Sequence, residues 1–162
     1  MTIGTGTLAG LARLRPGVRR ARVSSYDQTG GNRDWWAFEP GQTRRIADIT
    51  GPGCIKHVWM TMGCEDKYQY RKVVLRMFWD GEPEPSVEVP IGDFFGLGHG
   101  LVRNFVSLPL QMSPENGRGF NCWFPMPFQS KARIEVTNEA DRPLNLYFYV
   151  DYEAYQVGCE IV

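Results

Sequence analysis

Residues 144–151 alternate strictly between two sets of side chains. One set is apolar and the other is polar or aromatic: Leu144, Leu146, Phe148 and Val150 against Asn145, Tyr147, Tyr149 and Asp151. Successive side chains of a β-strand point to opposite faces, so this pattern predicts a strand with one buried face. A strand of this kind needs a second layer to cover its apolar side, which makes a sandwich or a barrel the expected architecture.

Seven further runs of β-forming residues are separated by turn signals. They cover residues 43–49, 54–61, 72–79, 86–89, 102–108, 120–124 and 132–138. Gly51-Pro52-Gly53 and Asp80-Gly81 are typical of turns, and the second pair favours a tight hairpin. Residues 92–101 are rich in glycine and predict a loop. About eight short strands without alternating helices predict an all-β fold, a single jelly-roll β-sandwich.

The first 22 residues follow a different pattern. Leu8, Leu11, Ala12 and Leu14 recur at helical spacing until Pro16 interrupts it. Five arginines accompany them: Arg13, Arg15, Arg19, Arg20 and Arg22. We expect a short N-terminal helical arm over residues 1–22 and a jelly-roll domain over residues 23–162. The arm has two interpretations, a solvated extension or a segment that docks on a neighbouring subunit.

Charge and cysteine usage narrow the range of functions. Lys and Arg together number 18, as do Asp and Glu, so the chain lacks the global field that attracts nucleic acid or an anionic membrane. No membrane-length apolar run and no signal peptide is seen, so we expect a cytoplasmic protein.

The spacing of Cys54, Cys64, Cys122 and Cys159 matches no zinc motif, and neither a metal nor a cofactor is expected. Reduced thiols are the default, and two buried disulfides are the alternative if the protein is exported by another route.

The segment 23–36, VSSYDQTGGNRDWW, concentrates polar and aromatic groups. Gly30 and Gly31 allow the backbone to turn tightly. Aromatic rings can stack on the C–H faces of a sugar while carboxylates and amides accept its hydroxyls. The candidate substrate-binding residues are therefore Tyr26, Asp27, Thr29, Asn32, Asp34, Trp35 and Trp36. The alternative is an ordered crossover loop whose tryptophans belong to the core.

The same segment opens a series of motifs that resembles the N-terminal half of glycoside hydrolase family 172 proteins. The series continues through GPGCIKHVWMT at 51–61, DGE at 80–82, PSVEVP at 85–90, GDFFG at 92–96, FPMPF at 124–128 and VDY at 150–152. The resemblance implies two tandem jelly-roll halves in a longer chain, related to double-jelly-roll capsid proteins. It also implies trimers or larger assemblies, arabinofuranosyl or fructofuranosyl substrates, and a pair of catalytic glutamates.

The chain departs from this family pattern at the catalytic residues. Aligned by eye, the acid/base glutamate falls at Gly92 and the nucleophile near Lys72 or Val73, none of which is a carboxylate. Glycosidases need two carboxylates about 5–10 Å apart. The acidic residues Glu82, Glu84, Glu88 and Asp93, or the pair Asp27 and Asp34, are weaker alternatives. His57 is expected to be a packed or surface histidine rather than a base, and His99 lies in the glycine-rich loop.

Two functional hypotheses follow from these observations. In the first, the chain is a glycoside hydrolase-like module, inactive alone, that contributes a furanoside-contact loop beside a second jelly-roll partner chain. In the second, it is a non-catalytic structural jelly roll that self-assembles as a trimer, tube or shell. Under either hypothesis we expect a homo-oligomer, a trimer or a multiple of it, with no nucleic-acid or membrane partner. The catalytic residues are not identified by the sequence.

Overall fold

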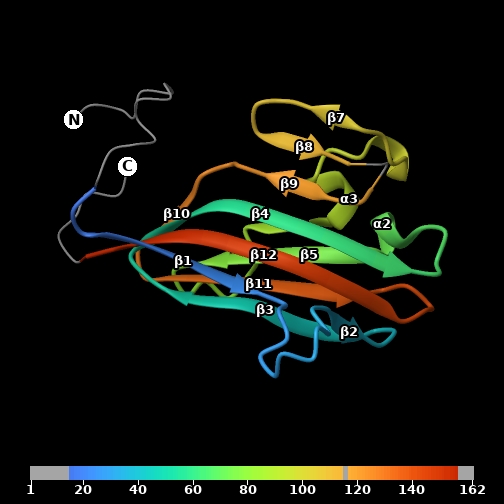
Figure 1. The fold of residues 1–162 in the computed structure, drawn as a ribbon, viewed down its shortest axis with the longest axis horizontal. Coiled ribbons are helices and arrows are strands. Elements are labelled where there is room, and N and C mark those ends of the chain that lie inside the picture. Colours follow the sequence, from blue (N-terminus) through green and yellow to red (C-terminus); the bar gives the residue numbers. More distant parts are fainter. Residues whose placement is uncertain (1–14, 115–116, 157–162) are drawn as a thin grey trace.

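A computed structural model describes residues 15–114 and 117–156 of the chain (Figure 1). Within them, two antiparallel sheets pack face to face as a sandwich. The larger sheet has the strand order β1-β12-β4-β9-β8-β7, with β2 paired to β12 and β10 paired to β4. The smaller sheet has the order β3-β11-β5-β6. The expected all-β sandwich is therefore confirmed.

The larger sheet combines strands from both ends of the described chain with strands from its middle. They are β1 (Val18–Ser24), β2 (Trp36–Phe38), β4 (Gly53–Cys64), β7 (Phe105–Val106), β8 (Leu110–Met112), β9 (Phe120–Cys122), β10 (Met126–Phe128) and β12 (Leu144–Tyr155). The smaller sheet consists of β3 (Thr43–Thr50), β5 (Val73–Trp79), β6 (Val87–Pro90) and β11 (Lys131–Asn138). Three short helical segments connect them: α2 (Gln69–Lys72), α3 (Ile91–Phe94) and the 3₁₀ segment η1 (Gly98–Gly100).

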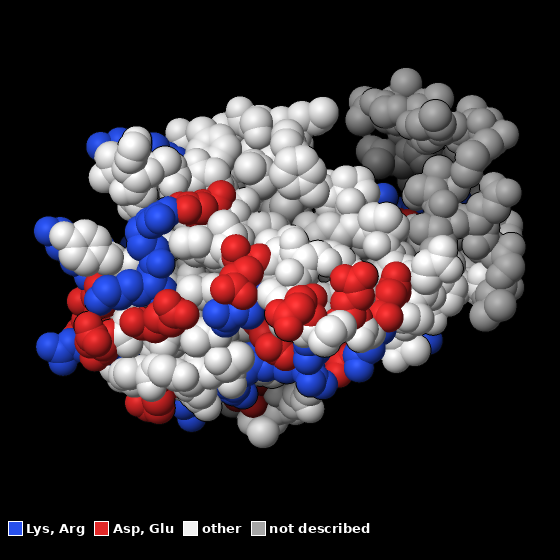
Figure 2. Space-filling model, turned by 180° about the vertical axis from the view of Figure 1, so that it is seen from behind, with Lys and Arg blue, Asp and Glu red and all other residues white. Residues whose placement is uncertain are grey.

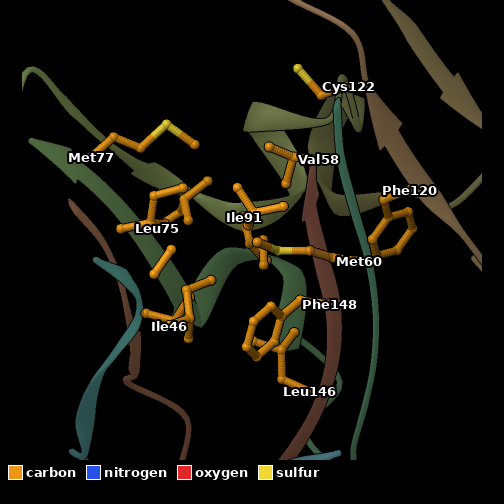
Figure 3. Close-up of a cluster of buried hydrophobic side chains, with 14 of the residues drawn as sticks. Ile46, Val58, Met60, Leu75, Met77, Ile91, Phe120, Cys122, Leu146 and Phe148 are labelled. Atoms are coloured by element: carbon orange, nitrogen blue, oxygen red, sulfur yellow. The ribbon is translucent and has the colours of Figure 1, made fainter. Parts of the chain in front are cut away.

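The core lies between the two sheets (Figure 3). The alternating residues of β12 behave as their pattern predicts, since Leu144, Leu146, Phe148 and Val150 are all fully buried. Met60 of β4 lies beside them in the larger sheet, Leu75 of β5 faces them from the smaller sheet, and Ile91 of α3 belongs to the same cluster. Burying a side chain of this size contributes about 1.5–3 kcal/mol, so these residues hold the layers together.

The first strand occupies residues that the sequence analysis assigns to the arm. Val18–Ser24 pairs along its full length with the C-terminal part of β12, from Val18 opposite Tyr155 to Ser24 opposite Tyr149. Residues 18–22 therefore belong to the sheet, and the boundary at residue 22 does not mark its beginning. The predicted helix over residues 8–14 lies outside the described residues.

The outer face of the smaller sheet is covered with ion pairs. Arg45 and Lys131 both contact Asp48, at 2.6 and 3.0 Å. Arg133 lies 3.4 Å from Glu135 on β11. Figure 2, seen from behind relative to Figure 1, shows basic and acidic side chains interspersed over this side of the molecule. Pairs of this kind suit a face in contact with water.

Candidate functional site

The predicted site segment forms a turn organised by one carboxylate. Asp27 Oδ1 accepts hydrogen bonds from the backbone N and the hydroxyl of Thr29, at 2.9 and 2.7 Å. Asp27 Oδ2 accepts another from the backbone N of Arg33, at 3.1 Å. A Cβ on Gly31 would lie 2.8 Å from Asp27 Oδ2, so this position favours glycine. The hydrogen bonds from Thr29 and Arg33 hold the pKa of Asp27 below its usual value.

A second set of contacts fixes this turn to the sheet. Asp34 Oδ1 accepts a 2.8 Å hydrogen bond from the backbone N of Asp27. The buried Ser25 hydroxyl donates to the Asp34 carbonyl oxygen at 2.8 Å and accepts from the backbone N of Phe148 at 3.0 Å. The loop is thus tied directly to β12. Asp27 and Asp34 are the residues that give it its shape.

The remaining predicted site residues divide into two groups. Tyr26 is 59% exposed, and Thr29 and Asn32 are also exposed. Trp35 is half-buried against Tyr147, with ring centroids 5.8 Å apart. Trp36 instead packs edge-on against Phe148 of the core, with the Arg44 guanidinium 4.3 Å from its ring centre. Trp36 therefore serves the core, and Tyr26, Thr29, Asn32 and Trp35 form the accessible surface of the loop.

Next to this loop, the outer face of the larger sheet carries a stack of side chains. The Arg22 guanidinium lies 4.4 Å from the centre of the Tyr149 ring. The other neighbour of Tyr149 is Trp59, with ring centroids 4.7 Å apart and an interplanar angle of 27°. The three groups come from the adjacent strands β1, β12 and β4. Tyr149 is thereby held between a cation and an indole, and 37% of it stays exposed.

His57 lies beside this stack in a polar network. Its Nδ1 is 3.0 Å from Asp151 Oδ2 and its Nε2 is 3.1 Å from Asn121 Oδ1. Arg22 donates to both Asp151 oxygens, at 2.5 and 3.0 Å, and the Trp123 ring stacks on the imidazole at 5.1 Å. Burial of Asp151 raises its pKa, but the hydrogen bonds from Arg22 and His57 outweigh this effect and lower it.

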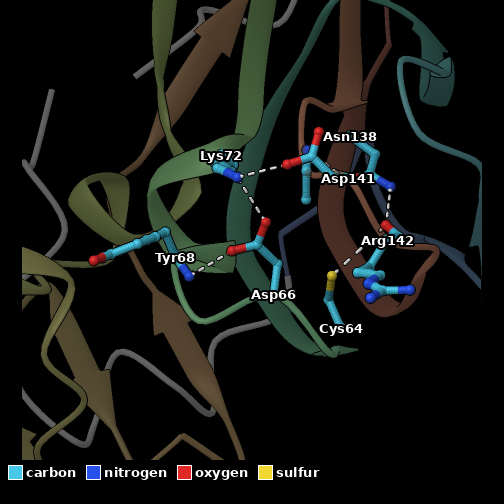
Figure 4. Close-up of polar contacts among 8 residues, drawn as sticks. Cys64, Asp66, Tyr68, Lys72, Asn138, Asp141 and Arg142 are labelled. Carbon is cyan, nitrogen blue, oxygen red and sulfur yellow. Dashed lines mark hydrogen bonds and ion pairs between the residues drawn. The ribbon is translucent and has the colours of Figure 1, made fainter.

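The two positions aligned with the family's catalytic glutamates have other roles in this fold. Gly92 is buried in α3, where an added Cβ would lie 2.9 Å from both the Cβ and the carbonyl oxygen of Tyr70. Val73 is fully buried in the core. Lys72 is held by two carboxylates, Asp66 at 2.7 Å and Asp141 at 3.1 Å (Figure 4).

The acidic residues considered as alternative catalysts differ in their surroundings. Glu88 pairs with Arg76 at 3.0 Å, and Asp93 pairs with Arg71. Glu84 is exposed. Glu82 borders a shallow hollow of about 300 Å³ on the charged face of the smaller sheet. Glu88 and Asp93 are therefore each neutralised by an arginine of its own.

Comparison with known proteins shows which family the chain belongs to. A protein-family model described as GH172 domain-like matches residues 32–149, which is more than half of the chain. The chain belongs to the GH172 domain-like family. Among curated proteins, no sequence matches it. A solved structure of infectious bursal disease virus, Gx strain, is similar over 88% of this chain and 33% of that chain, with 8% identity and a TM-score of 0.43. The chain therefore spans about a third of the length of that viral chain.

The described part of the GH172 chain lacks the groupings that other site types need. Within residues 15–114 and 117–156, no three His, Cys, Asp or Glu side chains are grouped to hold a metal ion. In the same part of the chain, no helix is long and apolar enough to cross a membrane. His99 is exposed in η1 with a φ of 57°. Outside the loop, His57, Asp151, Arg22 and Asn121 of the GH172 chain form the polar network described above.

Proposed function

We propose that this GH172 chain is a jelly-roll module that contacts a furanosyl glycan through residues 26–35 and supplies no catalytic glutamate of its own. The observation that carries the proposal is the construction of the loop. Asp27 and Asp34 fix its backbone, while Tyr26, Thr29 and Asn32 remain exposed. A site whose shape is fixed before binding loses less conformational entropy when a flexible sugar arrives.

The strand order supports a single jelly roll. Four strands of the larger sheet follow the order β1-β12-β4-β9, and the smaller sheet follows β3-β11-β5-β6. In both rows, early strands of the chain lie beside late ones, as in two Greek keys folded together. Every strand pair along these rows is antiparallel.

The surroundings of Gly92 and Lys72 support the non-catalytic part of the proposal. Gly92 has backbone and side-chain atoms of Tyr70 where a side chain would begin, and Lys72 carries a positive charge between two aspartates. Two carboxylates about 5–10 Å apart would have to come from another domain or chain. The glycan would then lie between this loop and that partner.

The test is a titration of the ¹⁵N-labelled chain with arabinofuranosyl and fructofuranosyl oligosaccharides, followed by amide chemical shifts. We expect shifts concentrated in residues 26–35 and no hydrolysis of either sugar. Tyr26→Ala should weaken binding about tenfold through loss of ring stacking. Asn32→Gly should also weaken it, because glycine retains the backbone at φ 60° and removes only the amide.

The matched control is Tyr68→Ala, which removes an exposed tyrosine from the turn before α2. It should bind as tightly as the parent chain. Shifts distributed away from residues 26–35, or equal binding by Tyr26→Ala and the parent, would overturn the glycan contact. Hydrolysis by the chain alone would overturn its non-catalytic character.

Self-assembly is the second candidate function, and a specific surface favours it. Val106 is 78% exposed and Leu108 is 96% exposed, both at the hairpin of β7 and β8. Exposed apolar groups that are grouped together mark interaction sites in soluble proteins. This function does not require the glycan contact.

A further inference from the structure

Polar and aromatic side chains form two rows across the outer face of the larger sheet, where β1, β12, β4 and β9 lie side by side (Figure 1). They point outward because their neighbours along each strand, such as Val58, Val150 and Cys122, are buried in the core. The strand pairing and the stacking of Trp123 on His57 give the first row: Arg22, Asp151, His57 and Trp123. The pairing alone gives the second row: Tyr149, Trp59 and Asn121. We call these residues the platform.

The platform continues the surface of the candidate glycan loop. Trp35, at the end of the loop, packs against Tyr147 on β12. Tyr147, Tyr149 and Asp151 then follow one another on the same face of this strand, at every second residue. At about 3.4 Å per residue, they cover roughly 14 Å along β12. The loop and the platform together are therefore longer than a single sugar ring.

One ring of the platform is available for stacking on a sugar. Trp123 lies with one face on the His57 imidazole, with ring centroids 5.1 Å apart and an interplanar angle of 14°, and 38% of it stays exposed. Tyr149 differs, because Arg22 and Trp59 cover its two faces and leave its edge and hydroxyl to a ligand. Trp123 is thus suited to stacking, and Tyr149 to hydrogen bonding.

The hydrogen-bonding groups beside Trp123 are held in place by one another. Arg22 donates two N–H groups to Asp151, and His57 lies between Asp151 and Asn121, at 3.0 and 3.1 Å. These contacts use only part of the capacity of the network, since a guanidinium has five N–H donors and a primary amide has two. The remaining donors can meet hydroxyl oxygens, and groups that are already ordered lose little entropy on binding.

We propose that the platform binds further sugar units of a glycan whose one end lies in the loop. Trp123 stacks on a sugar ring, and Arg22 and Asn121 donate to its hydroxyls. This inference rests on the proposed function and extends it from a single loop to a binding surface for an oligosaccharide. The order of residues along the surface predicts that a short sugar reaches only the loop, whereas a longer one also reaches Trp123.

An oligosaccharide suits the platform better than a protein partner does. None of the residues in the two rows is aliphatic, and Asp151 lies inside its row, although aspartate is depleted in protein–protein interfaces. The charges of Arg22 and Asp151 neutralise each other, which suits an uncharged ligand. Aromatic faces beside a few fixed polar groups are typical of sites for small polar molecules.

The test titrates the ¹⁵N-labelled full chain with arabinofuranosyl and fructofuranosyl oligosaccharides of increasing length. The disaccharide should shift only residues 26–35, and the hexasaccharide should also shift the indole N–H of Trp123 and the amide of Asn121. Affinity should rise about tenfold from the shorter sugar to the longer one. Loop shifts at every length, with constant affinity and no shift of Trp123, would overturn the platform and leave the proposed function standing. Absence of shifts in both regions would overturn the proposed function as well.

Trp123→Ala should lower the affinity for the hexasaccharide roughly five- to tenfold and leave that for the disaccharide unchanged. Phe124→Ala is the matched control, because it removes the adjacent aromatic side chain, which is 48% exposed and lines the hollow beside Met77 and Trp79 instead. It should bind both sugars as the parent chain does. Equal effects of the two substitutions would overturn the role of Trp123. A change of mass in light scattering for Trp123→Ala, with every sugar affinity unchanged, would make the platform a protein interface and overturn the inference.

Discussion

The Asp80 carboxylate caps the turn that contains Ser130. Asp80 Oδ1 accepts a 2.7 Å hydrogen bond from the backbone N of Ser130, and it also accepts from the backbone N of Gln129 and Lys131 at 2.9 and 3.1 Å. Asp80 itself adopts a φ of 54° at the turn after β5. The Asp80 side chain therefore joins the turn after β5 to the connection between β10 and β11.

This contact predicts a pH-dependent contribution to stability. Burial raises the pKa of Asp80, but the backbone hydrogen bonds outweigh that effect and lower it. A lowered pKa contributes stability above the unfolded value of about 3.9, and the contribution is lost as pH falls through the folded pKa. Asp80→Asn should reduce the free energy of unfolding at pH 7 by about 1 kcal/mol, with a smaller difference at pH 3.

Urea denaturation at both pH values measures this difference. Asparagine tolerates a positive φ, so the substitution keeps the turn while it removes the charge and replaces one acceptor oxygen by an NH2 donor. Asp141→Asn is the control, since its side chain is 89% exposed and its ion pair with Lys72 should contribute little. An Asp80→Asn effect of the same size at pH 7 and pH 3 would contradict the assignment.

Gly92→Ala tests the packing of α3 against α2. The new Cβ would lie 2.9 Å from the Tyr70 carbonyl oxygen, which is backbone and cannot rotate away. We expect a loss of about 1–3 kcal/mol in the free energy of unfolding. Gly63→Ala is the control, because an added Cβ there meets nothing within 4 Å. Equal unfolding midpoints for the two variants would show that α3 shifts at no cost.

Asn138→Ala should destabilise the end of the sandwich near β2. The fully buried Asn138 side chain donates to the carbonyl oxygens of Phe38 and Arg142, at 3.2 and 2.9 Å, and accepts from the backbone N of Ala140 at 3.1 Å (Figure 4). Leaving buried polar groups without partners costs about 1–3 kcal/mol each. The exposed Asn145 on β12 provides the control, and Asn145→Ala should change the thermal midpoint little.

The thiols of Cys54 and Cys122 should resist labelling in the native protein. Both are buried, and burial raises the pKa of each thiol. The thiolate is the reactive form, so a disulfide reagent at pH 8 should label these two slowly and at full rate only after denaturation. Mass spectrometry of the labelled peptides separates them from the half-buried Cys64. Rapid native labelling of Cys122 would contradict its burial.

The cytoplasmic location and the redox state of Cys159 remain predictions.

Patterning predicted the long central strands and the edge strands β6 and β7, but it missed β1, β2, β8 and β10. The runs at 43–49, 54–61, 72–79 and 132–138 all became strands, with ends shifted by a few residues. β1 was missed because three of its seven residues are arginines, two of them consecutive, which hides the alternation of a strand. β8 and β10 are each three residues long, too short for alternation to be distinguished from a loop. The expected run at 102–108 shortens to Phe105–Val106.

The candidate loop was visible in the sequence because its residues are contiguous. The network around His57 was not, because Asn121, Asp151 and His57 lie on three strands whose register no local pattern determines. The alternation in β12 did indicate that Tyr149 and Asp151 face away from the core. It could not indicate which residues of β4 lie opposite them.

The pairing of β12 with β4 is irregular at Lys56. Asp151 lies opposite His57 and Tyr152 lies opposite Ile55, so Lys56 is an extra residue on β4, a β-bulge. Removal of Lys56 would leave both pairings and both faces of the strand as they are. Removal of a residue between Val58 and Met62 would exchange buried and exposed side chains over the rest of the strand. Among relatives of this chain, gain or loss of a single residue in this strand should therefore occur at the position of Lys56.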